Sequence, residues 1–238
     1  MNINNDYNLM RVDVAKPIYN ITPFTLLDYP HKTACILWFA GCNMRCLYCY
    51  NPDIVLGKGK LSFHEALNFL KTRINLLDGV VLSGGECTLH KGCINLITEI
   101  KKMGLLVKID TNGTAPLILD CLIREKLIDY VALDFKAPTE MFKFITNSNL
   151  YSKFIYSLKL LINSNVPFEV RTTIHSSLLA QKDIQKMIEV LEKFDYRGTY
   201  YIQKFMNDTD TLSGIENSEL NPINFTSLNT KLSVVLRN

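Results

Sequence analysis

The sequence predicts an α/β fold in which six parallel strands alternate with helices and form a partial barrel. Two observations favour this fold. Short runs rich in β-branched and aromatic residues alternate with longer stretches of helical periodicity, which is the pattern of repeated β/α units. The β-type runs are also apolar almost throughout, as expected where both faces of a sheet are covered.

The expected strands are six short apolar runs, at 34–40, 79–83, 105–110, 130–135, 167–174 and 199–205. The expected helices have apolar residues at helical spacing, at 63–77, 93–103, 116–127, 151–162 and 184–194. Ser62 and Glu65 form a capping box before the first helix, and Pro116 occupies the first position of the third. Six units are too few for the usual eight-unit closed barrel, which favours a partial barrel. A doubly wound open sheet remains an alternative on periodicity alone.

Composition indicates an ordinary globular protein, because 47% of the 238 residues are hydrophobic and 21% are charged. The net charge of +3 is too small, without a clustered basic patch, to indicate a nucleic-acid partner. The N-terminal stretch 1–16 lacks the apolar region of a signal peptide, and no run of about eighteen apolar residues occurs. We therefore expect a cytoplasmic protein with no membrane partner.

Three of the seven cysteines stand close together after the first strand. Cys42, Cys46 and Cys49 have C-x3-C-x2-C spacing, so a loop can direct three thiolates toward one point. Thiolates suit iron–sulfur clusters and zinc, but a structural zinc site needs a fourth ligand that no second cysteine pair supplies. Three ligands leave one corner of a [4Fe–4S] cluster open. The other four cysteines are expected to be packing or spectator residues, namely Cys35, Cys87, Cys93 and Cys121.

Polar residues follow the other strands, and in a parallel sheet these carboxyl ends meet at one edge. The strand ends read SGGE at 83–86, DTNG at 110–113, LDFK at 133–136, VRTT at 170–173 and IQKF at 202–205. Taken singly, SGGE and DTNG are also typical of turns, and LDFK of a strand end with a lysine reaching solvent. Their arrival at the same edge as the cysteines favours a functional site.

The pair CNMRCLYC and SGGE resembles the two motifs of the radical S-adenosylmethionine (SAM) superfamily. The resemblance covers about residues 20–205 and implies a single radical SAM domain over 1–238, with short terminal extensions. The stretch 25–55 is similar to the opening of glycyl-radical activating enzymes, most of all the activating protein of anaerobic ribonucleoside-triphosphate reductase. The sequence departs from that group at Tyr50, where histidine is usual, and at Cys87, where proline is usual.

The resemblance implies a role for each strand-end residue. Cys42, Cys46 and Cys49 would bind one [4Fe–4S] cluster, and SAM would occupy the open iron. The carbonyls of Gly84 and Gly85 and the carboxylate of Glu86 would accept hydrogen bonds from the SAM amino group. Asp110 and Asn112 would contact the ribose and methionyl parts of SAM, and Lys136 and Arg171 would contact its carboxylate. The Tyr48 backbone would contact the adenine edge, and Gln203 would contact the adenosine side.

The implied reaction is reductive cleavage of SAM to methionine and a 5′-deoxyadenosyl radical, which generates a glycyl radical on a partner enzyme. The expected partners are anaerobic ribonucleotide reductase and a low-potential reductant, flavodoxin or ferredoxin. Two alternatives remain. One is a radical SAM enzyme acting on a small molecule of the deazapurine-precursor type, and the other is an electron-transfer iron–sulfur protein.

Overall fold

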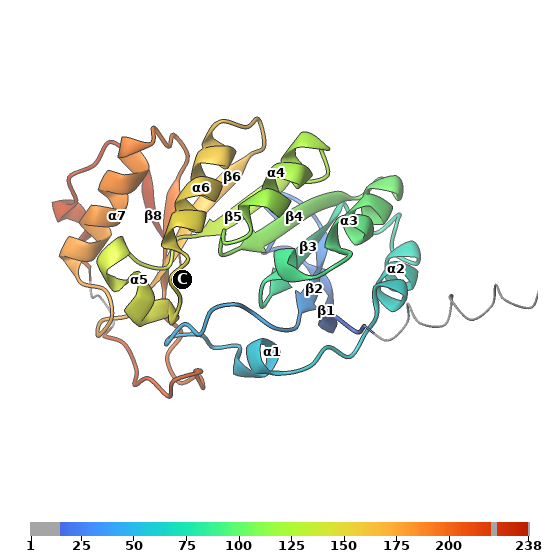
Figure 1. Cartoon of the computed structure of the whole chain (residues 1–238), viewed down its shortest axis with the longest axis horizontal. Helices are drawn as coiled ribbons and strands as arrows, with labels where there is room; N and C mark the ends of the chain where they lie inside the picture. Colours follow the sequence, from blue (N-terminus) through green and yellow to red (C-terminus); the bar gives the residue numbers. More distant parts are fainter. Residues whose placement is uncertain (1–14, 220–222, 238) are drawn as a thin grey trace, which may run out of the picture.

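Eight strands form one sheet in the described part of the chain, and each strand is hydrogen-bonded to the next one in sequence (Figure 1). The computed structural model describes residues 15–219 and 223–237. The strands are β1 (Ile18–Thr25), β2 (Ala34–Phe39), β3 (Gly79–Gly84), β4 (Leu106–Thr111), β5 (Tyr130–Asp134), β6 (Phe168–Ile174), β7 (Tyr200–Lys204) and β8 (Val234–Arg237). β1 is antiparallel to β2, whereas β2 to β8 are parallel to one another.

The α-helices of the described residues lie between the strands along the chain. They are α1 (Pro52–Leu56), α2 (Phe63–Lys71), α3 (Cys93–Lys102), α4 (Pro116–Arg124), α5 (Thr139–Thr146), α6 (Tyr151–Ile162) and α7 (Gln181–Lys193). The predicted capping box of α2 is confirmed, because the Glu65 N–H donates to Ser62 Oγ and the Ser62 N–H donates to the Glu65 carboxylate. The sequence predicted that α2 would reach Leu77, but the helix ends at Lys71. Just after this end the Thr72 hydroxyl donates to the Phe69 carbonyl, and the chain continues as turns.

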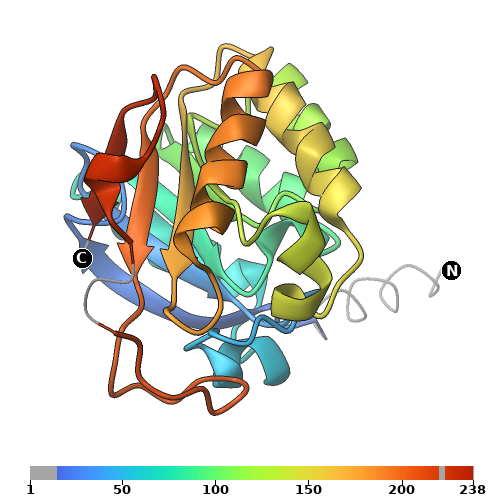
Figure 2. The same cartoon turned by 90° about the vertical axis from the view of Figure 1, so that its left-hand side faces the viewer.

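The sequential strand order distinguishes a barrel-like sheet from a doubly wound one. A doubly wound sheet reverses its strand order at a switch point, and this sheet does not. Right-handed crossovers that all run the same way place their helices on one face. Figures 1 and 2 show α2, α3, α4, α6 and α7 in an arc outside the sheet. Within the described ranges no pairing joins β8 to β1, so the predicted partial barrel is confirmed, with β1 and β8 added at its edges.

The main core lies between the sheet and these helices. Outward-facing strand residues such as Leu37, Leu82 and Ile109 are fully buried there. The opposite, inner face has a small apolar cluster of Tyr29, Ala34, Ile36 and Val81. Farther along, the inner face carries charged side chains, and the prediction of strands apolar on both faces is wrong for β4 to β6. These residues are Lys108, Asp110, Asp134, Glu169 and Arg171.

The elements that sequence analysis missed are short or at a sheet edge. β1 contains Pro23, which an edge strand tolerates because one side of its backbone needs no partner. β8 has four residues, too few for a clear alternation. α1 and α5 have five and eight residues, below the length at which helical periodicity is convincing.

No helix in residues 15–219 and 223–237 combines the length and apolar character needed to cross a membrane. Most of the N-terminal stretch 1–16, in which we found no targeting pattern, lies outside the described residues.

Candidate active site

A cavity of about 260 Å³ opens at the carboxyl ends of the parallel strands. All but one of the site residues expected from the sequence line this cavity, and the exception is Glu86. The lining residues from that set are Cys42, Cys46, Tyr48, Cys49, Gly84, Gly85, Asp110, Asn112, Lys136, Arg171 and Gln203. They come from six successive strand ends, so the topology alone brings together residues that span more than half of the chain.

The cysteine loop, residues 41–51, is held by backbone contacts to distant parts of the chain. The Arg45 and Leu47 N–H groups donate to carbonyls of the last turn of α5, over 2.8 and 2.9 Å. On the other side, the Leu212 N–H donates to the Cys49 carbonyl over 2.8 Å, and the Ser213 hydroxyl donates to the Leu47 carbonyl over 2.8 Å. The loop is therefore fixed by two segments that sequence analysis did not connect with it.

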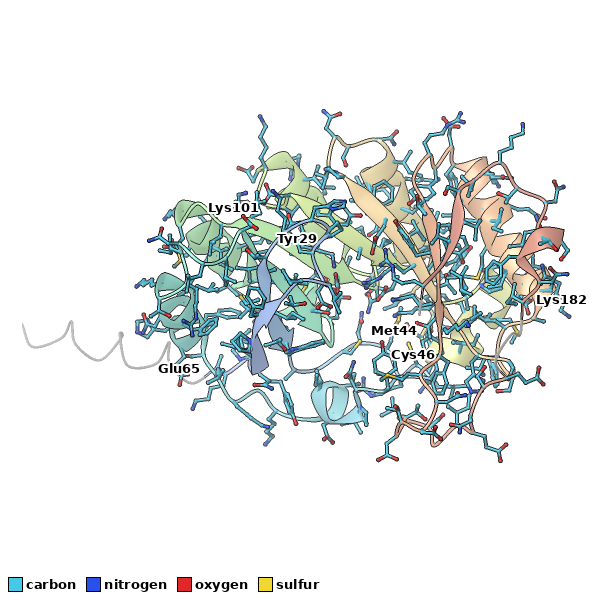
Figure 3. The ribbon with its side chains drawn as sticks, turned by 180° about the vertical axis from the view of Figure 1, so that it is seen from behind. Tyr29, Met44, Cys46, Glu65, Lys101 and Lys182 are labelled. Carbon is cyan, nitrogen blue, oxygen red and sulfur yellow. The ribbon has the colours of Figure 1, made fainter. Side chains whose placement is uncertain are left out.

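The three thiols share the cavity and lie in each other's electrostatic field. Burial raises the pKa of Cys42, and it raises the pKa of Cys46 to about 12 against the opposing charge of Lys136. The Met44 N–H lies 3.4 Å from the Cys42 sulfur and Asn112 Nδ2 lies 3.7 Å from it, and both donate to that sulfur. In Figure 3, Met44 and Cys46 lie between β1 on one side and β7 and β8 on the other.

These residues fit an iron–sulfur cluster by donor type, spacing and surroundings. Metal binding requires deprotonated thiols, and N–H donors with a nearby cation stabilise that charge. Among the described residues no three Cys, His, Asp or Glu side chains are already placed around one metal ion. A [4Fe–4S] cluster differs from such a site, because each cysteine binds a different iron.

The two glycines of SGGE are required by close packing of the chain against itself. Gly84 has φ of 110°, and a Cβ there would lie 2.6 Å from the Phe39 nitrogen. A Cβ on Gly85 would lie 1.8 Å from the Gly41 carbonyl oxygen. The Glu86 N–H also donates to that oxygen over 2.9 Å. β3 therefore ends directly against the beginning of the cysteine loop, which only glycine permits.

Glu86 is the one expected site residue that lies behind the cavity lining. The side chain is fully buried and does not line the cavity. Its oxygens accept hydrogen bonds from the N–H and hydroxyl of Thr88, the Thr111 hydroxyl and, over 2.7 Å, the Asn112 N–H. Three of these donors bind Oε1 and one binds Oε2, so Glu86 joins the ends of β3 and β4. The expected contact of its carboxylate to the SAM amino group stays a prediction.

Asn112 connects the Glu86 carboxylate to the cysteine loop. Its side-chain N–H donates to Asn43 Oδ1 over 3.0 Å, and the Asn43 amide donates to the Thr114 hydroxyl over 2.8 Å. The side-chain oxygen of Asn112 accepts from the N–H and hydroxyl of Thr114. β3, β4 and the cysteine loop are thus tied together by one polar network.

A chain of alternating charges lines the other side of the cavity. Arg171 lies between two carboxylates, 2.9 Å from Asp134 and 3.6 Å from Asp110. Lys108 pairs with Asp110, and Lys136 pairs with Asp134 over 3.0 Å. Lys108 does not line the cavity, whereas Asp28 does, so the charged lining consists of two cations, Lys136 and Arg171, and three carboxylates.

The pKa directions follow from this pairing. Burial opposes ionisation of Asp110 and Asp134, but the neighbouring cations outweigh it and hold the pKa of both carboxyls below the ordinary value. Burial likewise opposes the charge of Lys136, yet Asp134 and other neighbours raise its pKa well above the ordinary value. All of these groups remain charged at neutral pH.

Sequence reasoning missed Asp134, which lines the cavity, and Lys108, which pairs with the cavity residue Asp110. Asp134 lies two residues before Lys136, and Lys108 lies two residues before Asp110. The period of two along a strand places each pair on one face, and this pattern was available in the sequence. Trp38, which also lines the cavity, had no such signal, since it lies in an apolar strand.

Comparison with known proteins agrees with this geometry. The sequence profile of the radical SAM superfamily matches residues 36–194. The chain belongs to the radical SAM superfamily. The matched region contains all of the site residues except Gln203, and a radical SAM enzyme uses a [4Fe–4S] cluster and SAM.

Two relatives are similar over most of the radical SAM chain. A protein of Methanocaldococcus jannaschii named as a glycyl-radical enzyme activating enzyme is 33% identical over 195 residues, which is 79% of each chain. The pyruvate formate-lyase-activating enzyme of Clostridium pasteurianum is 29% identical over 184 residues, covering 73% of this chain and 76% of its own.

A solved structure shows the same fold. Streptococcus suis SuiB bound to S-adenosylmethionine superposes with a TM-score of 0.66 at 12% identity. The match covers 83% of this chain and 48% of SuiB, so the radical SAM chain spans about half the length of that protein.

Proposed function

We propose that this radical SAM enzyme generates a glycyl radical on a partner enzyme. The observation that carries the proposal is the cavity in which the three cysteines face the Asp110–Arg171–Asp134–Lys136 charge chain. Similarity to two proteins named as activating enzymes, over 79% and 73% of this chain, supports the class of substrate.

In this proposal Cys42, Cys46 and Cys49 hold one [4Fe–4S] cluster and leave one iron for SAM. When bound, the cluster supplies the electron that cleaves SAM to methionine and a 5′-deoxyadenosyl radical. The carbonyls of Gly84 and Gly85 accept from the SAM amino group, and they line the cavity beside the cysteine loop.

The charged residues orient the remainder of SAM. Lys136 and Arg171, two cations of the cavity lining, attract its carboxylate. Asp110 and Asn112 contact the ribose and methionyl parts, the Tyr48 backbone contacts the adenine edge, and Gln203 contacts the adenosine side. Each of these residues lines the cavity, which supports the assignment.

The substrate in this proposal is a glycine in a loop of a large partner protein. The radical takes a hydrogen atom from the glycine Cα, so 5′-deoxyadenosine forms and the unpaired electron remains on the partner. Anaerobic ribonucleotide reductase is the partner favoured by the motif at residues 25–55, and a flavodoxin or ferredoxin is the proposed reductant.

The test combines reduced, cluster-loaded protein, SAM and candidate glycyl-radical enzymes of the same organism under anaerobic conditions. Electron paramagnetic resonance should show a glycyl doublet with one partner, and the Cys46→Ala variant should give none. If a small molecule is converted and no candidate gives the doublet, the enzyme belongs to the small-molecule class of radical SAM enzymes. If SAM is never cleaved, electron transfer becomes the better description.

A further inference from the structure

The segment 206–219, which we name the strap, follows β7 and contacts the cysteine loop (Figure 1). The Leu212 N–H donates to the Cys49 carbonyl over 2.8 Å, and the Ser213 hydroxyl donates to the Leu47 carbonyl over 2.8 Å. No residue of the strap, all of which the structure describes, lines the cavity. The strap therefore contacts the loop that carries Cys49 without entering the space for a ligand.

Two pairs of residues close the base of the strap. Asn207 Nδ2 donates to the Ser218 carbonyl over 2.9 Å, and the Ser218 N–H donates back to Asn207 Oδ1 over 2.8 Å. Asp208 and Asn217 exchange two further hydrogen bonds, over 2.9 and 2.8 Å. These bonds join the two arms of the strap into one unit. The position of its base therefore determines where residues 212–213 meet the cysteine loop.

His175, directly after β6, fastens that base to the barrel. Its Nδ1 accepts from the Ser177 N–H over 3.2 Å, so the neutral ring carries its hydrogen on Nε2. Nε2 donates to the Glu216 carbonyl of the strap over 2.7 Å. The Ser176 N–H also donates to the Ser218 hydroxyl over 2.9 Å, beside this bond. The end of β6 is thus connected to the cysteine loop through the strap.

The surroundings of His175 hold its ring in this orientation. The side chain is 1% exposed and packs edge-on against Phe205, with 4.6 Å between the ring centroids. A buried histidine is often only a satisfied core residue, and its hydrogen bonds then stay within the core. The acceptor of His175 Nε2 belongs instead to Glu216, an exposed residue of the strap. The effect of the hydrogen bond is therefore to fix the strap.

We propose that His175 is a positioning residue for the iron–sulfur cluster, because it fixes the strap and the strap fixes the backbone of Cys49. This inference rests on the proposed function, in which Cys49 binds the cluster. Residues 41–51 form neither a helix nor a strand, so the position of the Cys49 thiol depends on contacts from other segments. Losing such a contact makes local opening of the loop less costly, and the cluster is then released faster.

The test compares His175→Leu and His175→Gln with the wild-type protein, each loaded with its cluster. Both replacements shorten the buried side chain, but only the glutamine amide can still donate to the Glu216 carbonyl. After addition of an iron chelator under anaerobic conditions, His175→Leu should lose iron about threefold to tenfold faster than the wild type. His175→Gln should stay within twofold of the wild type. Equal rates in the two variants would overturn the role of His175.

Hydrogen exchange of the cluster-free full chain separates a local role from a general one. His175→Leu should reduce the protection of backbone amides in residues 206–219 and 41–51, including that of Leu212. The amides of β2 to β6 should keep their wild-type protection. Loss of protection throughout these strands would show that His175 only supports the fold, and unchanged protection of Leu212 would show that it does not hold the strap.

Ser213→Ala tests the contact between the strap and the cysteine loop directly. Ser213 is exposed, so the variant should fold normally and release iron about twofold to tenfold faster than the wild type. Ser227→Ala is the matched control, because this exposed hydroxyl donates to the Asn224 carbonyl instead of to the cysteine loop. Iron release at the same rate in both serine variants would overturn the proposal.

Failure of this inference is distinguishable from failure of the proposed function. If the wild type holds a cluster and yields a glycyl radical while His175→Leu releases iron at the wild-type rate, only the role of His175 is wrong. If the wild-type protein holds no cluster after reconstitution, both fail.

Discussion

The backbone N–H of Asn112 donates to the Glu86 carboxylate over 2.7 Å, and this bond joins the ends of β3 and β4 beneath the cysteine loop. The side chain of Asn112 continues the connection to Asn43, inside the loop. The Glu86 carboxylate is therefore an acceptor that connects two strand ends, and through Asn112 it helps to position the cysteine loop. Its contact to a ligand stays a prediction.

Glu86→Ala should destabilise the protein by roughly 2–4 kcal/mol, because the Thr88 and Asn112 N–H groups lose a buried acceptor. Glu86→Gln should also destabilise it, since one carboxylate oxygen becomes an NH2 group facing N–H or hydroxyl donors. Urea unfolding of the cluster-free protein measures both changes. Glu99→Gln, in an exposed ion pair with Lys102, is the matched control and should be near neutral. Wild-type stability with weaker SAM binding in Glu86→Ala would favour the ligand contact over this structural role.

Replacing any one of Cys42, Cys46 and Cys49 by alanine should reduce the iron and sulfide recovered after anaerobic reconstitution. A cluster held by three protein ligands loses a third of them in each variant. Cys121→Ala, on α4, and Cys87→Ala should retain the wild-type content. A full cluster in Cys42→Ala, together with loss in Cys87→Ala, would show that the ligands are assigned wrongly.

Arg171→Gln should weaken SAM binding about tenfold or more, because a cation of the cavity lining is removed and Asp110 and Asp134 lose their shared cation. Equilibrium dialysis with the cluster-loaded protein gives the affinity. Arg124→Gln breaks an exposed ion pair with Asp120 and serves as the control, with no change expected. Equal SAM affinity in the two variants would remove Arg171 from the binding site.

The charge chain also predicts a pH dependence of stability. The pKa of Asp110 and of Asp134 is lowered in the folded protein, so both contribute stability above the unfolded value of about 3.9. That contribution is lost as the pH falls through the folded values. The urea concentration at the unfolding midpoint of the cluster-free protein should therefore decrease when the pH is lowered below about 4. In Arg171→Gln the fall should begin at higher pH, and an identical profile in the two proteins would contradict the pairing.

Six of the seven parallel strands, β2 to β7, could be predicted because each is a local apolar run with clear turn residues around it. The convergence of Cys42, Asp110, Lys136 and Arg171 could be predicted as well, because carboxyl ends of parallel strands meet whatever the detailed packing. The position of Asp134 in the cavity could also have been predicted, because side chains two residues apart on a strand lie on the same face.

The remainder depends on contacts that no local pattern contains. Glu86 finds its partners Thr111 and Asn112 on the next strand end, so its role follows from tertiary structure alone. The hydrogen bond from the Ser213 hydroxyl to the Leu47 carbonyl, which helps to hold the cysteine loop, joins residues that are far apart in the sequence. In the described part of the chain β1 and β8 each pair with one other strand, and such edge strands need little of the hydrophobic alternation on which strand prediction relies.

The most direct measurement is the yield of 5′-deoxyadenosine and methionine from SAM after reduction of the cluster-loaded protein. Wild type and Cys121→Ala should form the two products in equal amounts, and Cys46→Ala should form neither. Product formation by Cys46→Ala at the wild-type level, or none by a wild-type protein with a full cluster, would contradict a radical SAM site built on Cys42, Cys46 and Cys49.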